Sequence, residues 1–338
     1  MNRVTVLLPV YNGAEFLAET IDSVLSQTYT DFDFLIINDA STDKSEEIIL
    51  SYTDSRIQYL LNEKNLGSIG SPQKGMDIIQ TEYIARIDQD DIWLPTKLEK
   101  QIRIMDANLR IGICGTSIEL FGDRSGIKIF PETNEHLKVG FLFFCCMSHP
   151  SVVLRKSFLM ETGITYNEAY RLADDYKMWI DCIDLTLIYN IPEPLVRYRQ
   201  HKGQICSAAN ASKQLLVQNK VRLEMLERIS SNFSQNEKDF HINRFVEGQI
   251  ESINNYKQFV KWSRVICQRN DQDGKYIDPN TLSVDLKYHL QIFLKRYILI
   301  CFFQEMNMKA LLRYFFSFNW IYLSTRRNIG IAKQCFFK

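Results

Sequence analysis

Continuous apolar runs are the first pattern along the N-terminal hundred residues. Each run is short, rich in β-branched side chains and followed by turn-forming or acidic residues, which predicts a buried strand. The runs cover residues 4–10, 34–37, 56–61 and 84–87. Apolar residues at helical spacing lie between them, so strands are expected to alternate with helices. This alternation predicts an α/β fold with a parallel sheet, whose ligands bind at the carboxyl ends of the strands.

Three helices are predicted between these strands. Two of them cover residues 16–27 and 45–52. Asp43 and Glu46 have the spacing of a capping box at the start of the second helix. Ser71 and Pro72 predict the start of the third helix, with Ser71 as N-cap and Pro72 at the first helical position.

An acidic cluster follows the fourth strand. Asp88, Asp90 and Asp91 lie within four positions, and carboxylates this close repel one another unless a cation lies between them. A hard divalent cation that holds phosphate oxygens would meet this need, whereas the alternative is a solvated turn, since Asp is a common turn former. Asp39 follows the second strand. Parallel strands end at one edge of a sheet, so we expect Asp39, Asp88 and Asp90 on the same rim, which favours a site.

Six short motifs share the order and spacing of a known family. They are Pro9-Val10-Tyr11-Asn12, Asn38-Asp39-Ala40-Ser41-Thr42-Asp43, Asn65-Leu66-Gly67, Ile87-Asp88-Gln89-Asp90-Asp91, Ala173-Asp174-Asp175-Tyr176-Lys177-Met178-Trp179 and Tyr198-Arg199-Gln200-His201. With them the chain resembles inverting glycosyltransferase family 2, which has the GT-A fold. The resemblance covers residues 1–207 and implies a nucleotide-sugar half, 1–105, and an acceptor half, 106–207. Residues 208–338 lie outside it and are predicted to be a helical C-terminal region.

The resemblance implies a division of roles among the acidic residues. Asp175 would be the catalytic base, and Asp90 would hold Mn²⁺ or Mg²⁺ on the diphosphate of a nucleotide sugar. Asp39 would hydrogen-bond the nucleotide base or ribose, and Asp88 would face the ribose. The remaining residues of the nucleotide cleft would be Pro9, Tyr11 and Asn12. Physical chemistry agrees, because displacement at the anomeric carbon needs a neutralised leaving group and an acceptor hydroxyl whose proton is removed.

The chain departs from the family pattern at a few positions. Asn38 stands where the family more often has Asp, and Asp174 stands where it more often has Glu. Asn38 removes one charge but keeps the capacity to hydrogen-bond. Pro72 and Gln73 stand where the family usually has Arg and Asn, which leaves the nucleotide contacts of that helix and the identity of the donor open.

Four residues are further candidates for contacts to phosphate, metal or acceptor. Asp174 could instead be an acidic residue that suits the dipole at a helix start, an interpretation that also applies to Asp175. Arg199 and His201 belong either to a surface basic cluster or to a loop that folds over the diphosphate. His149 either borders the acceptor pocket or is structural.

The composition is that of a soluble globular protein with balanced charge. Its 338 residues include 40 Lys or Arg and 40 Asp or Glu, which gives no support to a nucleic-acid-binding protein. The eight cysteines form no CxxC pair and have no spacing with histidine that suits zinc. Residue 1 leads directly into the first predicted strand, so we expect no targeting segment and free thiols in a reducing cytosol.

The last part of the chain is basic and aromatic. Residues 287–338 carry nine Lys or Arg against one acid, Glu305, together with many Phe, Trp and Tyr. Their longest apolar runs are too short to span a bilayer, which takes about 20 residues. The pattern predicts an interfacial segment on an anionic membrane surface. The alternative is a helical cap that packs on the catalytic domain, with the Lys and Arg stems reaching outward.

The sequence therefore predicts a metal-dependent, inverting glycosyltransferase of the hexosyltransferase class. The resemblance implies a UDP-linked donor and a glycan acceptor on a lipid carrier, in the synthesis of bacterial capsule, O-antigen or another polysaccharide. The expected location is the cytoplasm, peripheral at the inner face of the cell membrane. Two alternatives stay open: a nucleotidyltransferase, which would want a glycine-rich loop after the first strand, and a non-catalytic scaffold of the same fold.

Overall fold

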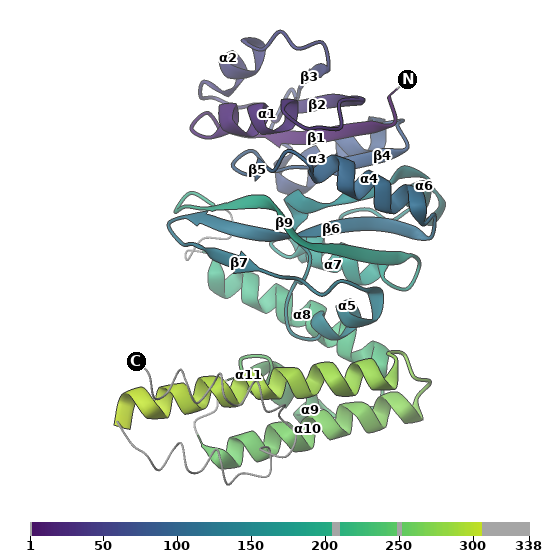
Figure 1. Cartoon of the computed structure of the whole chain (residues 1–338), viewed down its shortest axis with the longest axis vertical. Helices are drawn as coiled ribbons and strands as arrows, with labels where there is room; N and C mark the ends of the chain where they lie inside the picture. The colour runs from purple at the N-terminus through teal and green to yellow at the C-terminus, as the bar shows by residue number, and fades with distance from the viewer. Residues whose placement is uncertain (1, 205–209, 249–251, 306–338) are drawn as a thin grey trace. The chain divides into compact units, whose positions relative to one another are not determined.

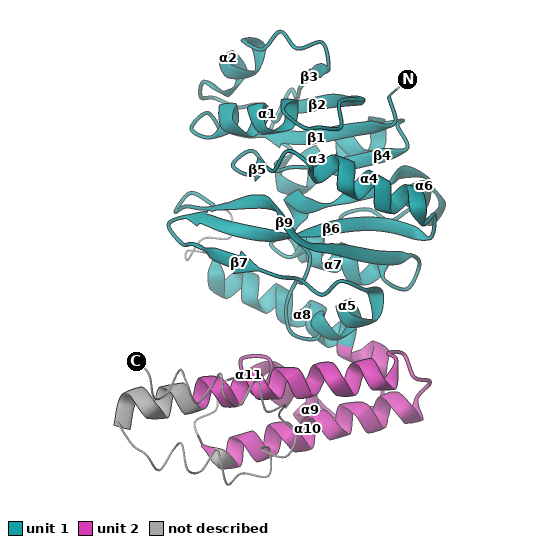
Figure 2. Cartoon of the chain, in the orientation of Figure 1, with its two compact units in different colours: residues 1–225 teal, residues 226–338 magenta. Residues whose placement is uncertain are grey.

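The computed structural model of the chain describes residues 2–204, 210–248 and 252–305. The chain forms two compact units, Met1–Met225 and Leu226–Lys338 (Figure 2). The division falls within helix α8 (Ala211–Ile229), most of which belongs to the first unit. The family resemblance implies that the catalytic domain ends at residue 207. This end is set by the extent of the family motifs and stays a prediction.

The first four strands form the parallel part of the sheet. They are β1 (Val4–Val10), β2 (Phe32–Asn38), β3 (Ile57–Leu61) and β4 (Tyr83–Arg86), in the order β3-β2-β1-β4 (Figure 1). β1 pairs with β2 on one side and with β4 on the other. The side chains of β1, β2 and β4 are almost all buried, which explains why these strands read as continuous apolar runs. The predicted α/β fold with flanking helices is confirmed.

Beyond β4 the sheet becomes mixed. The order continues β4-β8-β6-β9-β5, and β7 pairs with the edge of β6. These strands are β8 (Val153–Arg155), β6 (Ile111–Gly122), β9 (Leu187–Gln200), β5 (Ile92–Trp93) and β7 (Gly126–Lys128). β8 runs antiparallel to both β4 and β6, whereas β6 and β9 are parallel. The expectation of a parallel sheet therefore holds for β1–β4 but not for the sheet as a whole, because β8 runs antiparallel to β4.

Helices flank this sheet in the first unit. They are α1 (Leu17–Leu25), α2 (Ser45–Leu50), α3 (Gly67–Ile78), α4 (Lys97–Ala107), α5 (Asn134–Gly140), α6 (Lys156–Thr162) and α7 (Asp174–Cys182), with short 3₁₀ turns η1 (His149–Ser151) and η2 (Glu168–Tyr170). α1 buries Leu17, Ile21 and Val24 completely, at the spacing that predicted it. Each such side chain contributes about 2 kcal/mol through burial.

The predicted start of α3 and the predicted capping box of α2 are wrong. α3 begins at Gly67, so Pro72 lies inside the helix instead of at its first position. The earlier start is possible because the carboxylate of Asp39 accepts the exposed N–H groups of the first turn. α2 begins at Ser45, where the sequence predicts it, but without a capping box: Asp43 Oδ1 accepts the N–H of Ser45 (3.0 Å), and Glu46 accepts a hydrogen bond from the Tyr59 hydroxyl (2.9 Å).

The second unit is helical, as the sequence predicted for this region. Besides the end of α8 it contains α9 (Gln235–Phe240), the π-helical turn η3 (His241–Phe245), α10 (Ile253–Gln272) and α11 (Pro279–Glu305). Its core is a cluster of aromatic rings that includes Phe245, Phe259 and Phe293, with centroids 5.6–6.0 Å apart. Residues 273–278 connect α10 to α11. Residues 306–338 of the basic, aromatic segment lie outside the described residues.

No helix between residues 2 and 305, in the parts that the structure describes, combines the length and hydrophobicity needed to cross a bilayer.

Candidate active site

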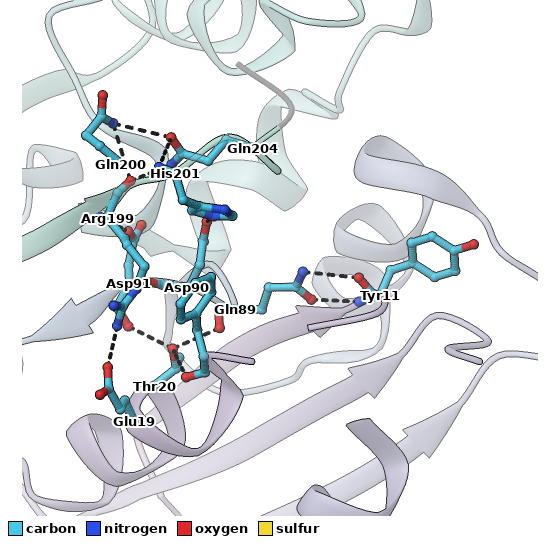
Figure 3. A network of polar contacts seen from close by, with 11 residues as sticks. Tyr11, Glu19, Thr20, Gln89, Asp90, Asp91, Arg199, Gln200, His201 and Gln204 are labelled. Carbon is cyan, nitrogen blue, oxygen red and sulfur yellow. Dashed lines mark hydrogen bonds and ion pairs between the residues drawn. The ribbon is translucent and has the colours of Figure 1, made fainter. Parts of the chain in front are cut away.

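The loops after β1, β2 and β4 meet at the carboxyl edge of the parallel strands. Tyr11 N–H donates to Gln89 Oε1 (2.8 Å), and Gln89 Nε2 donates back to Tyr11 O (3.1 Å). Asn12 Oδ1 accepts from Thr42 N–H (2.8 Å). From α1, the Thr20 hydroxyl lies 2.9 Å from the carbonyl oxygen of Gln89. The three loops therefore form one hydrogen-bonded rim, with Pro9 at the end of β1 and the ring of Tyr11 pointing away from the acidic cluster (Figure 3).

Asp39 organises the second loop of this rim. Its side chain is buried and accepts hydrogen bonds from the backbone N–H of Leu66 and Gly67 (2.9 Å each) and from Asn62 Nδ2 (2.7 Å). Lys74 Nζ in turn donates to Asn62 Oδ1 (2.7 Å). In this structure the carboxylate of Asp39 thus holds the N-terminus of α3, and its contact with a nucleotide stays a prediction.

The three carboxylates after β4 have different surroundings. Asp88 accepts from the nearly buried Arg86 (Nη2 to Oδ1, 2.9 Å) and keeps a third of its side chain exposed. Asp90 Oδ2 lies 2.9 Å from His201 Nε2, and burial together with the charge of Asp88 raises the pKa of Asp90. Asp91 is buried, and burial raises its pKa well above the usual range. Only Asp88 and Asp90 therefore have side chains that a ligand could reach.

The end of β9 and His201, which follows it, lie against this cluster (Figure 3). Arg199 N–H donates to Asp91 Oδ1 (2.8 Å), and Arg199 Nε donates to the carbonyl oxygen of Asp90 (2.8 Å). The guanidinium also pairs with Glu19 and lies over the ring of Phe16, 4.3 Å from its centroid. Arg199 therefore fixes the acidic loop, and it places His201, two residues on, against Asp90. Arg199 and His201 thus contact the acidic loop, and their contact with a phosphate or metal stays a prediction.

Asp174 and Asp175 form the first turn of α7. Asp175 Oδ1 accepts the N–H of Tyr176 (2.7 Å), and Cys145 Sγ lies 3.9 Å from its other oxygen. Burial, and next the charge of Asp174, raise the pKa of Asp175 above its usual range. Burial also raises the pKa of Asp174. Both carboxyl groups are therefore less acidic than ordinary Asp side chains, and the role of Asp175 as catalytic base stays a prediction.

Backbone strain is concentrated at these loops. Four non-glycine residues of the described chain have positive φ, and three of them lie here: Asn12 (50°), Ala40 (58°) and Leu172 (81°). Leu172 is the most unusual, because a bulky side chain rarely tolerates this region. It lies two residues before Asp174. Such strain is typical of functional sites, where the surrounding structure enforces it.

The partly exposed His149 and the buried Tyr166 form a polar pair near both groups of carboxylates. His149 of η1 and Tyr166 share a hydrogen bond (Nε2 to Oη, 2.6 Å). The imidazole also meets the ring of Trp179 on α7 edge-on, with centroids 6.1 Å apart. Tyr166 itself is fixed by its N–H, which donates to Gln73 Oε1 of α3 (3.1 Å). His149 of η1 therefore contacts both Tyr166 and Trp179, and Trp179 belongs to α7, the helix that carries Asp175.

Comparison with known proteins agrees with this arrangement. Residues 5–159 match the model of glycosyl transferase family 2. An uncharacterized glycosyltransferase of Haemophilus influenzae is 31% identical over 222 residues, which cover 61% of this chain and 68% of the relative. The chain belongs to glycosyltransferase family 2. A more distant relative of this glycosyltransferase, 27% identical over 65% of this chain and 86% of its own length, is the Escherichia coli UDP-Glc:alpha-D-GlcNAc-diphosphoundecaprenol beta-1,3-glucosyltransferase WfaP.

Solved structures share the fold of this glycosyltransferase. S. aureus TarS 1–349, in complex with UDP-GlcNAc, matches with a TM-score of 0.57 at 16% identity, covering 87% of this chain and 91% of TarS. The mannosyltransferase PcManGT from Pyrobaculum calidifontis, in complex with GDP-Man and Mn²⁺, matches with a TM-score of 0.51 at 12% identity, covering 94% of this chain and 88% of its own. Both are GT-A glycosyltransferases, and the GT-A prediction is confirmed.

The acidic edge of the glycosyltransferase fits a divalent cation shared with substrate phosphates. The described chain contains no cluster of three or more His, Cys, Asp and Glu side chains placed to hold a metal alone. Mg²⁺, however, is usually bound by one or two carboxylates plus substrate phosphates. Asp90 and Asp88 offer such oxygens, and the raised pKa of Asp90 reflects negative charge that a cation would offset. Behind them, Asp91 Oδ2 is buried without a hydrogen bond from the described residues.

Two residues of the site were not found from the sequence. Arg86, the ion-pair partner of Asp88, gave a signal: it is the one charged residue in the apolar run 84–87. Tyr166 gave none, because it lies in the segment between α6 and α7, and only the tertiary fold brings it to His149.

Proposed function

We propose that this glycosyltransferase moves a hexose from a UDP-linked donor to a hydroxyl of a lipid-carrier-linked glycan, with inversion at the anomeric carbon. Asp90 would hold the diphosphate through Mn²⁺ or Mg²⁺, and Asp88 would face the ribose. Pro9, Tyr11 and Asn12 would line the nucleotide cleft with Asp39. Asp175 would remove the proton of the acceptor hydroxyl.

The observation that carries this proposal is the contrast between two groups of carboxylates in one site. Asp88 and Asp90 lie at a strand edge with oxygens that a ligand can reach, next to the basic residues Arg199 and His201. Asp175 lies on a different element and is less acidic than an ordinary Asp. A base with a raised pKa accepts a proton more readily, which suits deprotonation of a sugar hydroxyl near neutral pH.

The bonds of the reaction balance with these groups. The acceptor O–H gives its proton to Asp175, and the oxygen forms a bond to the anomeric carbon. The bond between that carbon and the β-phosphate oxygen breaks, and its electron pair leaves with the nucleoside diphosphate. A bound divalent cation would supply the positive charge that stabilises this leaving group. A base and a leaving group on opposite faces of the sugar give inversion.

The relatives support the choice of substrates. WfaP is named for a UDP-linked glucose donor and a diphosphoundecaprenol-linked acceptor, and TarS was solved with UDP-GlcNAc. A lipid-linked acceptor would place the enzyme at the inner face of the bacterial membrane, where the basic, aromatic residues 287–338 would favour an anionic surface. The pathway would be synthesis of capsule, O-antigen or another surface polysaccharide.

A nucleotide-release assay tests this function. Purified protein with Mn²⁺ is given UDP-glucose, UDP-galactose, UDP-GlcNAc and GDP-mannose, with and without a diphosphoundecaprenol-linked sugar acceptor. Acceptor-dependent release of UDP is the expected result. Release of pyrophosphate from a nucleoside triphosphate and a sugar phosphate would instead indicate a nucleotidyltransferase. Donor binding without release under any condition would indicate a scaffold.

A further inference from the structure

His149 and Tyr166 lie near both groups of carboxylates, because the charge of Asp88 acts on both side chains and the charges of Asp174 and Asp175 act on Tyr166. The 3₁₀ turn of His149 leads into Val152, whose carbonyl oxygen accepts the N–H of Arg86 (2.9 Å), and Arg86 pairs with Asp88. On its other side the imidazole meets Trp179, which lies in the helix that begins with Asp174 and Asp175. In the proposed function the anomeric carbon lies between the diphosphate at Asp90 and the base Asp175, so the transferred sugar would lie close to this pair of side chains.

The pair also has the protonation states that suit a sugar hydroxyl. Burial lowers the pKa of His149 to about 3, so the imidazole is neutral, and burial raises the pKa of Tyr166, so the phenol keeps its proton. Carboxylates such as Asp88 and Asp175 can only accept hydrogen bonds when ionised. A neutral imidazole can donate one, and it can do so without adding a charge that would compete with a cation for the diphosphate.

The hydrogen bond between the two side chains selects the tautomer. The phenol O–H of Tyr166 has His149 Nε2 as its partner at 2.6 Å. If the phenol donates, the imidazole proton is on Nδ1. His149 is partly exposed, and Nδ1 makes no hydrogen bond within the described chain, so this N–H is open to a ligand.

We propose that His149 donates a hydrogen bond from Nδ1 to a hydroxyl of the transferred sugar, and that Tyr166 is the positioning residue that fixes the tautomer and orientation of the imidazole. This inference rests on the proposed nucleotide-sugar donor. In the proposed function the acidic groups contact nucleotide, diphosphate and acceptor. His149 adds a contact to the transferred sugar, and Tyr166 supports His149.

Two amide variants separate the two ring nitrogens. The amide nitrogen of Asn takes the place of His Nδ1, whereas that of Gln takes the place of Nε2. His149→Asn therefore keeps the donor toward the sugar, and His149→Gln loses it while keeping a polar group toward Tyr166. Isothermal titration in Mn²⁺ measures the affinity of each variant for UDP and for UDP-glucose, or for the panel donor with the highest turnover.

The inference predicts a selective effect. His149→Gln should weaken binding of the nucleotide sugar by about three- to tenfold, the size of one neutral hydrogen bond, and leave UDP affinity unchanged. His149→Asn should stay within about twofold of wild type for both ligands. Equal affinities of wild type and His149→Gln for the nucleotide sugar would overturn the inference. So would an equal loss for UDP and nucleotide sugar in both variants, which would mark His149 as structural.

Tyr166→Phe tests the positioning role with a spectroscopic signature. In protein with ¹⁵N-labelled histidine, the His149 ring of the wild type should show the Nδ1–H tautomer, and that of Tyr166→Phe should show Nε2–H or a mixture. Tyr166→Phe should also weaken nucleotide-sugar binding in wild type but not in His149→Asn. An unchanged tautomer would contradict the role of Tyr166. Failure of wild-type protein to bind UDP or any panel donor would refute the proposed function itself, a different result.

Discussion

Neighbouring groups make the carboxylates of this site chemically different from one another. The carboxylate of Asp39 accepts hydrogen bonds from two backbone N–H groups and one side-chain amide, and the side chain of Asp91 is buried. Asp88 is neutralised by Arg86, and Asp90 meets His201. The order of these residues along the chain does not reveal which of them are exposed or which partners they contact. The individual roles follow from exposure and partners, which only the tertiary structure provides.

We predict that Asp90→Asn abolishes transfer and weakens Mn²⁺-dependent UDP binding while the protein stays folded. The amide still offers an oxygen to His201, so the fold loses little, but it is a poor ligand for a hard cation. Transfer assays, titration with UDP in the presence and absence of Mn²⁺, and thermal melting measure the three effects. Wild-type turnover of Asp90→Asn with Mn²⁺ would remove the metal role from this residue.

Asp174 should set the pH dependence of the base. The base acts when it is deprotonated, so kcat/KM should fall as pH drops through the raised pKa of Asp175. Asp174→Asn removes the neighbouring negative charge that helps to raise that pKa, so the acidic limb of the profile should move to lower pH. Asp181→Asn, on the same helix, is the control and should leave the limb in place. A limb that stays or moves upward in Asp174→Asn contradicts the coupling.

At the scale of elements, strands were easier to predict than helix ends. The runs 4–10, 34–37, 56–61 and 84–87 match β1 to β4 closely because burial on both faces leaves a direct pattern in the sequence. The start of α3 was missed because its cap comes from Asp39, 28 residues earlier in the chain than Gly67. The antiparallel entry of β8 beside β4 was also missed, since a three-residue strand has no periodicity to detect.

Removal of this remote cap should destabilise the fold. Asp39→Ala leaves two backbone N–H groups and the Asn62 amide without their acceptor, and each buried donor left unpaired costs about 1–3 kcal/mol. We therefore expect the free energy of unfolding to fall by about 3 kcal/mol or more in urea titrations. Asp31→Ala, at the exposed opposite end of β2, is the control and should change it by less than about 0.5 kcal/mol. Similar values for the two variants would show that the cap has no stabilising role.

At the scale of the whole molecule, the two units differ in how far the sequence described them. Motifs covered the first unit, whereas only composition described the second. The basic, aromatic zone from residue 287 is in fact divided. Leu290, Phe293 and Leu294 of α11 are buried within the second unit, so this part of the zone is core and not a membrane-facing surface. These three side chains are therefore not available for lipid contact, whereas Lys287 and Tyr288 of the same helix are exposed.

We expect truncation after Glu305 to abolish binding to anionic vesicles and to leave UDP binding intact. The removed residues carry six Lys or Arg and no acid, and each basic side chain near an anionic surface contributes about 1 kcal/mol. Vesicle sedimentation at low and high salt measures the effect, because salt should weaken the attraction. Neutral vesicles are the control. Full-length protein that ignores anionic vesicles at low salt would leave the segment without a membrane role.

The most direct test of the whole account compares turnover and donor affinity in Asp175→Asn. In the proposed function, Asp88 and Asp90 after β4 bind the donor, and Asp175 of α7 removes the proton. It predicts that kcat falls by about a hundredfold or more, because a general base acts in the transition state, while the affinity for the nucleotide sugar stays that of wild type. Asp181→Asn should behave as wild type in both measurements. Lost donor affinity with undiminished turnover at saturation would contradict the account.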